Sequence, residues 1–540
     1  MRICPTTLKH KSKLIEQYRA HDEKIISYFD YKPFDSLEKR ASDLEGRKFR
    51  RQDLKESLYE MNQLWGAPAE TLQNINKFTD ENSVVVIGGQ QAGLFTGPMY
   101  SINKIISIIL FAKEQERKLN VPVIPVFWIA GEDHDYDEIN HVYMNKSGKL
   151  QKHILQQSVT IKKSLSHVEI NKQQMKKWID EAFQQIKETP NTKQLLNKLY
   201  NCLTSSNSFV DFFAQSIFQL FSTEGIVLVD SAHPNIRLLE SEMFTNIIRK
   251  QNPIAKNVFE TTEQLRQNGY NLSLDVAMDD AHLFYHDNNN ERILLKRNGN
   301  EWVGKNDEVL LTTNELETIA KQSPEKLSNN VISRPLMQEY LFPTLAFIGG
   351  DGEISYWATL KKAFHELNMK MPPVIPRLSF TYITKKTSKL LENLALDPTF
   401  VLNNNVAEIK ANWLLSQQQP PLQILMEQLK EDFAKAHKPL REFATEVSPD
   451  LGQLANKNLE NIMNQLNFLE NKLITHLKEK YEHQMNNYNN IELAIKPNGV
   501  LQERIWSPLE IVNEYGIQFL KEILSSNFTF KNDHYFIYLN

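Results

Sequence analysis

The sequence predicts an α/β protein with a doubly wound core, inserted segments and a C-terminal α-helical antiparallel coiled coil. Two glycine-containing loops, at 88–97 and 349–352, each follow a short apolar stretch and precede a helical one. After about residue 391, leucines and phenylalanines instead recur at spacings of three and four. The first pattern is typical of βαβ units in a parallel sheet, and the second is typical of helices packed along a seam.

Composition limits the class of protein. The 540 residues carry 62 basic and 66 acidic side chains, a formal net charge of −4, which argues against a nucleic-acid partner. The two cysteines, Cys4 and Cys202, exclude a disulfide scaffold and a cysteine-built zinc site, and they fit a reducing compartment. The most apolar run, Ile105 to Ala112, is shorter than the ~20 residues of a membrane span. We therefore expect a cytoplasmic protein with no membrane partner.

The predicted core covers residues 1–390. Its first βαβ unit joins an apolar strand at 84–87, a helix from Pro98 to about Lys118, and a second apolar strand at 121–129. Proline is favoured at the first position of a helix, and runs of β-branched residues favour buried parallel strands. The spacing of the three elements predicts a right-handed crossover unit.

A second unit of the same kind follows, with a strand at 345–348, a helix from Glu353 and a strand at 374–376. Between the two units we expect a helical insertion at about 151–222, where lysine and glutamine are frequent. We also expect a small antiparallel β-rich insertion at about 255–330, where short alternating segments are separated by turn residues. Two such units in one chain predict a doubly wound sheet.

Residues 391–505 are expected to form the coiled coil, and residues 506–540 to return to the core. Two stretches with helical apolar spacing flank a turn at 448–450, which predicts an antiparallel hairpin that dimerises. The number of heptads is small, and an ordinary helical subdomain is the alternative. The apolar positions are Leu422, Leu425, Leu429, Phe433, Ala436, Leu440 and Phe443, then Leu459, Ile462, Leu466, Leu469 and Leu473.

Glycine is scarce, with 18 residues in all, so the cluster at 88–97 needs a physical reason. The loop matches neither the dinucleotide pattern G-x-G-x-x-G nor the P-loop pattern, because Gln90 and Leu94 stand at required positions. Two general features are left after these patterns are excluded. The loop lets a ligand approach the backbone, and the N-terminus of the following helix favours anions. Lys104 lies either beside that ligand or at the solvated edge of a packed helix. The candidate binding residues are Gln90, Gln91, Gly93, Thr96, Gly97, Tyr100 and Lys104.

Five acids and one histidine fall within residues 132–138, directly after an apolar strand that contains Trp128. Ligands of open α/β sheets bind outside the carboxyl ends of strands, where this loop should lie. We expect His134 to be the general acid or base, oriented by Asp133 or Asp135. The acids could also bind an ammonium group or Mg²⁺. The alternative is an acidic, solvated turn. Trp128 and Glu132 are added to the candidate binding residues.

The second glycine loop also ends a predicted strand and begins a predicted helix. Gly349, Gly350 and Glu353 are therefore candidate binding residues, as is Arg377, which follows the next strand. A turn alone would also explain so short a loop. No protein-bound metal is assigned from the sequence.

Taken together, these motifs resemble those of the bacillithiol-biosynthesis cysteine-adding enzymes, a family of cysteine ligases. The first two stretches are specific, and the similarity extends over essentially the whole chain. Met99, Ser101 and Asn103 depart from the residues expected there, which puts any role of the 101 and 103 side chains in doubt. The similar stretches are 89–100 with Lys104, 125–135, 334–340, Pro343-Thr344, 349–353, Pro376-Arg377 and 501–504.

The resemblance implies a Rossmann-like core, a coiled coil that forms a homodimer, and a ligase that joins cysteine to glucosaminyl-malate through an amide bond. Similarity to class I synthetases implies ATP with Mg²⁺, although no ATP motif is present. The resulting hypothesis is that Gln90, Gln91 and the 93–98 backbone bind an anionic group. Lys104 would stabilise charge, and His134 with Asp133 or Asp135 would move the amine proton.

Two other interpretations stay open. A dimeric, non-catalytic nucleotide-binding scaffold would explain the missing ATP motifs, but not the acid-rich loop at 132–138. A synthetase relative that acts on tRNA is opposed by the net negative charge.

Overall fold

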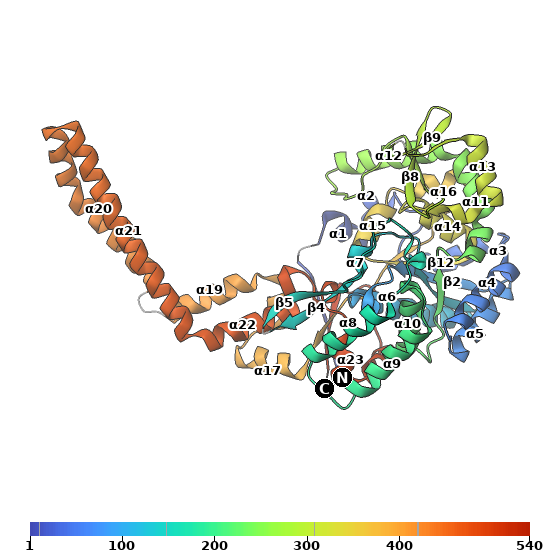
Figure 1. Cartoon of the computed structure of the whole chain (residues 1–540), viewed down its shortest axis with the longest axis horizontal. Helices are drawn as coiled ribbons and strands as arrows, with labels where there is room; N and C mark the ends of the chain where they lie inside the picture. The colour runs from blue at the N-terminus through green and yellow to red at the C-terminus, as the bar shows by residue number, and fades with distance from the viewer. Residues whose placement is uncertain (10, 147, 307, 418–420, 540) are drawn as a thin grey trace. The chain divides into compact units, whose positions relative to one another are not determined.

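A five-stranded parallel sheet forms the centre of the larger of two units (Figure 1). The structure, a computed structural model, describes residues 1–9, 11–146, 148–306, 308–417 and 421–539. The core unit comprises most of residues 1–382 and the segment from 502 onward, whereas the helical unit comprises 383–501. The sequence placed the corresponding boundaries at 390 and 505.

The order of the parallel strands defines where a ligand can enter. From one edge to the other the order is β13, β12, β2, β3, β6. The chain runs outward from β2 through β3 to β6 and then crosses to β12 and β13, so the winding direction reverses between β2 and β12. This confirms the predicted doubly wound α/β core, and the reversal opens a crevice at the carboxyl ends of those two strands. The strands are β2 Val84–Gln90, β3 Val123–Ile129, β6 Val227–Asp230, β12 Thr344–Gly349 and β13 Val374–Pro376.

Helix α6, Tyr100–Leu119, connects β2 to β3 and packs against both strands. Its apolar residues cover the sheet, but it also carries a buried polar stripe. Asn103 Nδ2 donates to Glu503 Oε2 at 2.6 Å, and the Tyr382 hydroxyl donates to Asn103 Oδ1 at 2.8 Å. Ser107 Oγ accepts the Leu378 N–H at 2.9 Å. The stripe is therefore covered by later segments of the chain and is not a solvated helix edge.

The glycines of the first loop permit close backbone contacts. A Cβ atom at Gly93 would lie 2.6 Å from the Cα of Gly97, and one at Gly89 would lie 2.6 Å from the carbonyl oxygen of Trp128 on β3. Gly97 also has a φ of +74°, which residues with a side chain rarely adopt. The cluster thus serves the tight turn and the strand packing.

The N-terminal helices support the sheet from its edges. On β6, the side-chain amide of Asn62 donates to the Leu228 carbonyl at 2.8 Å and accepts its N–H at 3.0 Å, as a neighbouring strand would. Arg40 donates to both carboxylate oxygens of the buried Glu339 at 2.6 and 2.7 Å. These helices are α1 Lys13–Arg19, α2 Glu23–Ile26, α3 Leu37–Glu45, α4 Arg51–Leu64 and α5 Ala69–Asn76.

Insertions between the parallel strands form a helical and a β-rich layer. The helical one follows the hairpin β4 His141–Lys146 and β5 Lys149–Ile154, and consists of α8 Lys172–Gln185, α9 Thr192–Ser205 and α10 Phe209–Leu220. The other is an antiparallel sheet in the order β10, β9, β8, β7, β11. Its strands are β7 Asp280–His286, β8 Arg292–Asn298, β9 Glu301–Gly304, β10 Leu310–Thr312 and β11 Leu327–Asn329. The helices around them are α7 Tyr136–Ile139, α11 Pro234–Arg249, α12 Gln251–Gln267, α13 Thr313–Gln322, α14 Ser333–Leu341, α15 Asp351–Trp357 and α16 Lys361–Glu366.

The two ends of the chain meet in a third small sheet. Its order is β1, β15, β14, and β1 pairs antiparallel with β15. This pairing ties the C-terminal segment into the core unit. The elements are β1 Arg2–Thr6, β14 Phe380–Ile383, α23 Leu509–Tyr515, α24 Gln518–Leu524 and β15 His534–Tyr538.

The helical unit contains the predicted antiparallel hairpin. Helices α20, Leu422–Val447, and α21, Pro449–Lys480, pack side by side along their length (Figure 1). The turn lies at Ser448, whose hydroxyl accepts the Leu451 N–H and caps α21. Within the described residues, no helix combines the length and the apolar character that crossing a bilayer requires. The other helices are α17 Lys385–Asn393, α18 Pro398–Asn403, α19 Val406–Ser416 and α22 Glu482–Ile495.

Candidate functional site

A cavity of about 400 Å³ lies in the crevice at the carboxyl ends of β2 and β12. The winding reversal of the sheet places it there, because loops from both halves of the sheet diverge at this point. Nine of the residues selected from the sequence line this cavity. These are Gln90, Gln91, Tyr100, Lys104, Trp128, Asp133, Gly350, Glu353 and Arg377.

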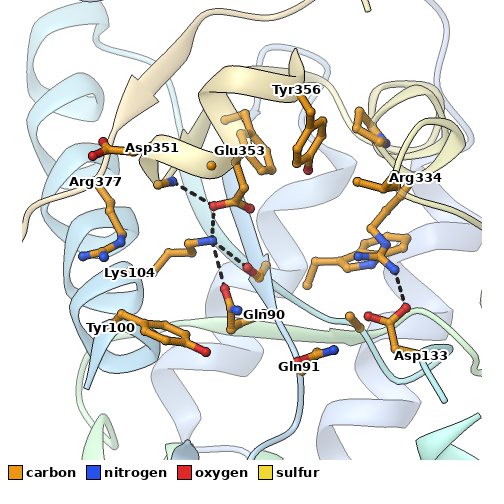
Figure 2. Close-up of a pocket in the computed structure, with 18 of the residues that line it drawn as sticks. Gln90, Gln91, Tyr100, Lys104, Asp133, Arg334, Asp351, Glu353, Tyr356 and Arg377 are labelled. Carbon is orange, nitrogen blue, oxygen red and sulfur yellow. Dashed lines mark hydrogen bonds and ion pairs between the residues drawn. The ribbon is translucent and has the colours of Figure 1, made fainter. Parts of the chain in front are cut away.

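Lys104 lines one wall of the cavity, between loops from the two halves of the sheet. Its ammonium donates to the Gly89 carbonyl at 2.8 Å, to Gln90 Oε1 at 3.2 Å and to Glu353 Oε2 at 2.5 Å (Figure 2). The same Glu353 oxygen accepts the Gly350 N–H at 2.8 Å. Burial lowers the pKa of Lys104, and the adjacent Glu353 carboxylate acts in the opposite direction. The pair thus joins the first glycine loop to the second across the crevice.

Arg377 lies on the same side of the cavity as Lys104 and Tyr100 (Figure 2). Its guanidinium is held by the buried carboxylate of Glu503, with NH2 to Oε1 at 2.7 Å and NH1 to Oε2 at 2.9 Å. Burial alone would favour a neutral Glu503, but Arg377 and its hydrogen bonds lower the pKa of that carboxyl to about 2. Arg377 is therefore a fixed cation of the cavity wall, and its charge is neutralised by Glu503, which does not line the cavity.

Asp133 and Arg334 face Lys104 from the opposite wall (Figure 2). Arg334 NH2 donates to Asp133 Oδ1 at 2.6 Å, and Arg334 Nε donates to Glu132 Oε1 at 3.0 Å. Tyr356 also lines this part of the cavity, and burial raises the pKa of its phenol above the usual value. The cavity thus has a carboxylate on one wall and an ammonium group on the other.

Glu132 lies behind the cavity and not in it. Its carboxylate accepts from Arg237 at 2.7 Å and from the Asn329 N–H at 3.0 Å, in addition to Arg334. Although burial opposes ionisation, Arg237, Arg334 and Arg292 lower the pKa of Glu132 to about 2. The structure thus gives Glu132 an internal role, as the anion that anchors Arg334.

His134 and Asp135 also lie outside the cavity wall. His134 Nδ1 lies 3.1 Å from Arg292 NH1, and its ring packs edge-on against Phe284. Burial and Arg292 lower the pKa of His134, so its neutral form is favoured. Arg292 NH1 lies 3.6 Å from Asp133 Oδ1 as well, which connects the histidine to the carboxylate at the wall. Asp135 is exposed, with Oδ1 3.8 Å from His134 Nε2.

Gly93, Thr96, Gly97 and Gly349 do not line the cavity. The 94–97 turn packs on the helical insertion, with the ring of Phe95 4.7 Å from that of Trp178. At the start of α6, the Met99 N–H donates to the Trp506 carbonyl at 2.8 Å. The C-terminal segment therefore covers the place where an anion was expected at the helix start.

Several cavity residues were not among the candidates: some come from distant segments, whereas Glu138 and Asp351 lie in the acid-rich loop and the second glycine loop but were not selected there. Arg334 and Gln338 belong to α14, Tyr356 and Asp351 to α15, Glu138 to α7, and Arg504 to the C-terminal segment. Arg334 and Arg504 did fall within the similar stretches, so the family pattern was the available signal. In the described parts of the chain no three metal-ligating side chains cluster. The chemistry that the cavity offers is binding of ammonium and carboxylate groups and transfer of protons.

Comparison with known proteins identifies the family. A family model described as Bacillithiol biosynthesis BshC, N-terminal Rossmann-like domain, matches residues 1–378, and one described as the C-terminal coiled-coil domain of BshC matches residues 380–539. A protein of Oceanobacillus iheyensis named "Putative cysteine ligase BshC" is 39% identical over the full length of both chains. Proteins of the same name from Bacillus cereus and Bacillus thuringiensis are 39% identical over 97% of this chain and 98% of theirs. The chain therefore belongs to the BshC family of bacillithiol-biosynthesis cysteine ligases, with a Rossmann-like core and a C-terminal coiled coil.

Proposed function

We propose that this protein joins the carboxyl group of cysteine to the amine of glucosaminyl-malate, forming the amide bond of bacillithiol. The observation that carries the proposal is the cavity at the sheet reversal, where Lys104 and Glu353 face Asp133 and Arg334. Such a site offers acidic side chains to the ammonium group of an amino acid and basic side chains to its carboxylate. It also places a cation where negative charge develops in the reaction. The names of the relatives support the ligase activity, and the substrates follow from the resemblance.

In this reaction the amine nitrogen bonds to the carboxyl carbon of cysteine, and one carboxylate oxygen leaves. Negative charge grows on the remaining oxygen as the tetrahedral centre forms, and Lys104 is the buried cation placed to stabilise it. The departing oxygen needs an activating group, for which similarity to class I synthetases implies ATP. The Trp506 carbonyl covers the N-terminus of α6, so this helix end does not supply a phosphate site.

The amine must lose protons as the amide forms. Asp133 is the carboxylate at the wall opposite Lys104, and we assign it the first contact with that amine. His134 Nδ1 accepts from Arg292, which also contacts Asp133, so His134 acts on Asp133 only through that guanidinium, and Asp133 is the group placed to take the proton. In this assignment His134 acts behind the cavity wall.

The activity has a direct test. Purified protein incubated with cysteine, glucosaminyl-malate, ATP and Mg²⁺ is expected to form bacillithiol, detected by mass spectrometry of the thiol. A strain that lacks the gene is expected to accumulate glucosaminyl-malate and to contain no bacillithiol. Omitting the nucleotide tests its role separately. Normal bacillithiol in the deletion strain would refute the ligase and favour the non-catalytic scaffold.

We also propose that the hairpin of α20 and α21 mediates a homodimer. Large apolar side chains stay exposed on both helices after they pack together; Phe443 is 65% and Leu454 64% exposed. Many large apolar side chains left exposed on one hairpin are typical of an interface. Further exposed members are Leu425, Leu440, Val447, Phe468 and Leu469.

Replacing Phe443 and Phe468 together by Asp is expected to convert a dimer into a monomer, because each charge would lie in the apolar interface. Light scattering at micromolar concentration measures the mass of both proteins. The control replaces Lys438, an exposed residue of α20, by Asp. A wild-type protein that is already monomeric would contradict the proposal.

A further inference from the structure

Arg504 differs from the other cations of the cavity. Lys104 contacts Glu353, Arg334 contacts Asp133 and Arg377 contacts Glu503, so each of these charges already has a partner within the fold. Arg504 also lines the cavity, but it is exposed and makes no ion pair or hydrogen bond to any residue that the structure describes. It is the cavity cation whose charge is left for a ligand.

The backbone on both sides of Arg504 is anchored. Glu503 is buried and accepts from Arg377, from Asn103 and, at 2.7 Å, from the Ser379 hydroxyl. Two residues after Arg504, the Trp506 carbonyl accepts the Met99 N–H. An ordinary surface arginine samples many positions, but this one extends from a short segment fixed at both ends. This anchored segment thus holds Arg504 at the cavity, which its side chain lines.

Tyr100, the first residue of α6, directly follows Met99, whose N–H donates to the Trp506 carbonyl, so Tyr100 lies near the segment that carries Arg504. Burial raises the pKa of the Tyr100 phenol, while the charges of Arg504 and Arg377 act in the opposite direction. Tyr100, Arg377 and Lys104 share one side of the cavity, and Arg504 lines the cavity from the segment next to Tyr100 (Figure 2). Asp133 and Arg334 lie across from them (Figure 2).

We propose that Arg504, with Tyr100 near it, binds a carboxylate of the amine substrate, such as one of the malyl group. The proposal rests on the function proposed above. A guanidinium can donate two parallel hydrogen bonds to a carboxylate, and the Tyr100 hydroxyl can donate a third. Such a contact orients the sugar amine toward the opposite wall, where Asp133 lies.

The test compares two amine substrates. Arg504→Ala is expected to raise the KM for glucosaminyl-malate by about 10- to 100-fold, the loss expected for one charged hydrogen-bonding group. The KM for cysteine and the rate with methyl glucosaminide, which has the amine but no carboxylate, should stay within twofold of wild type. Arg504→Lys should recover part of the loss, because it restores the charge but not the planar fork. Arg117→Ala, an exposed arginine of α6, is the matched control.

Calorimetry separates this inference from the proposed function. Glucosaminyl-malate, titrated without cysteine or nucleotide, should bind the wild-type protein at least tenfold more tightly than Arg504→Ala. Wild-type binding with this dependence but no product would refute the ligase and leave the inference standing. Normal product with an unchanged KM for glucosaminyl-malate in Arg504→Ala would overturn the inference and leave the ligase standing. A rise in the KM for cysteine alone would also overturn it.

Discussion

Lys104→Met is expected to lower kcat/KM for bacillithiol formation by at least about 100-fold. Methionine keeps the length and apolar stem of the side chain but removes the ammonium that contacts Gly89, Gln90 and Glu353. Because its three N–H groups are already donated, Lys104 acts on the developing oxyanion through its charge, and loss of such a preorganised group typically costs a factor of about 10² to 10³. Steady-state kinetics with both substrates measure the loss.

Two comparisons make this result specific to Lys104. Lys113→Met changes a half-exposed lysine of the same helix, which pairs with Glu224 away from the cavity, and should keep wild-type kinetics. Lys104→Arg keeps the charge, but a planar guanidinium cannot meet the three acceptors around the ammonium, so it should stay well below wild type. Thermal unfolding checks that each variant is folded. A folded Lys104→Met protein with wild-type kcat/KM would exclude Lys104 from catalysis.

The fold was largely predictable because its signals are local. The apolar runs at 84–87 and 121–129 are rich in β-branched residues and too apolar for exposed strands, and a glycine closely follows each run. The seam of leucines and phenylalanines predicted the α20–α21 hairpin in the same way. Periodicity of this kind depends only on which face of an element is buried.

The site was predictable only where its polar or charged residues lie at the end of a strand or soon after it. Gln90, Asp133 and Glu353 lie at or beyond the carboxyl ends of β2, β3 and β12, so strand order alone brings them together. Arg334 and Arg504 come from helix α14 and the C-terminal segment, whose positions depend on contacts between distant residues. Sequence spacing carries no information about such contacts.

Glu132 and His134 show a second limit. Both follow β3 as an active-site loop would, and sequence alone does not distinguish a carboxylate that faces a ligand from one that faces an arginine. Glu132 lies against Arg237, Arg334 and Asn329, whereas its neighbour Asp133 reaches the cavity. The arginines come from α11 and α14, far along the chain. Which of two adjacent acids binds substrate is therefore decided by tertiary packing.

Glu503→Gln is expected to lower the free energy of unfolding of the core unit by about 3 kcal/mol at pH 7. The carboxylate is fully buried, and its pKa of about 2 lies well below the usual 4.5, a difference that corresponds to about 3 kcal/mol. The amide leaves the buried Arg377 charge unbalanced, and breaking a buried ion pair costs about 3 to 5 kcal/mol. Urea unfolding followed by tryptophan fluorescence measures the change.

The pH dependence of that loss identifies its cause. A carboxyl whose pKa is lowered by folding contributes its full stabilisation above its unfolded pKa of about 4.5, and loses it as the pH falls toward about 2. The stability difference between wild type and Glu503→Gln should therefore be constant from pH 7 to about 5 and shrink below that. Glu514→Gln, which alters an exposed acid in the same C-terminal segment, should show neither the loss nor its pH dependence. A difference that persists unchanged down to pH 3 would mean that packing, and not the charge on Glu503, holds Arg377 in place.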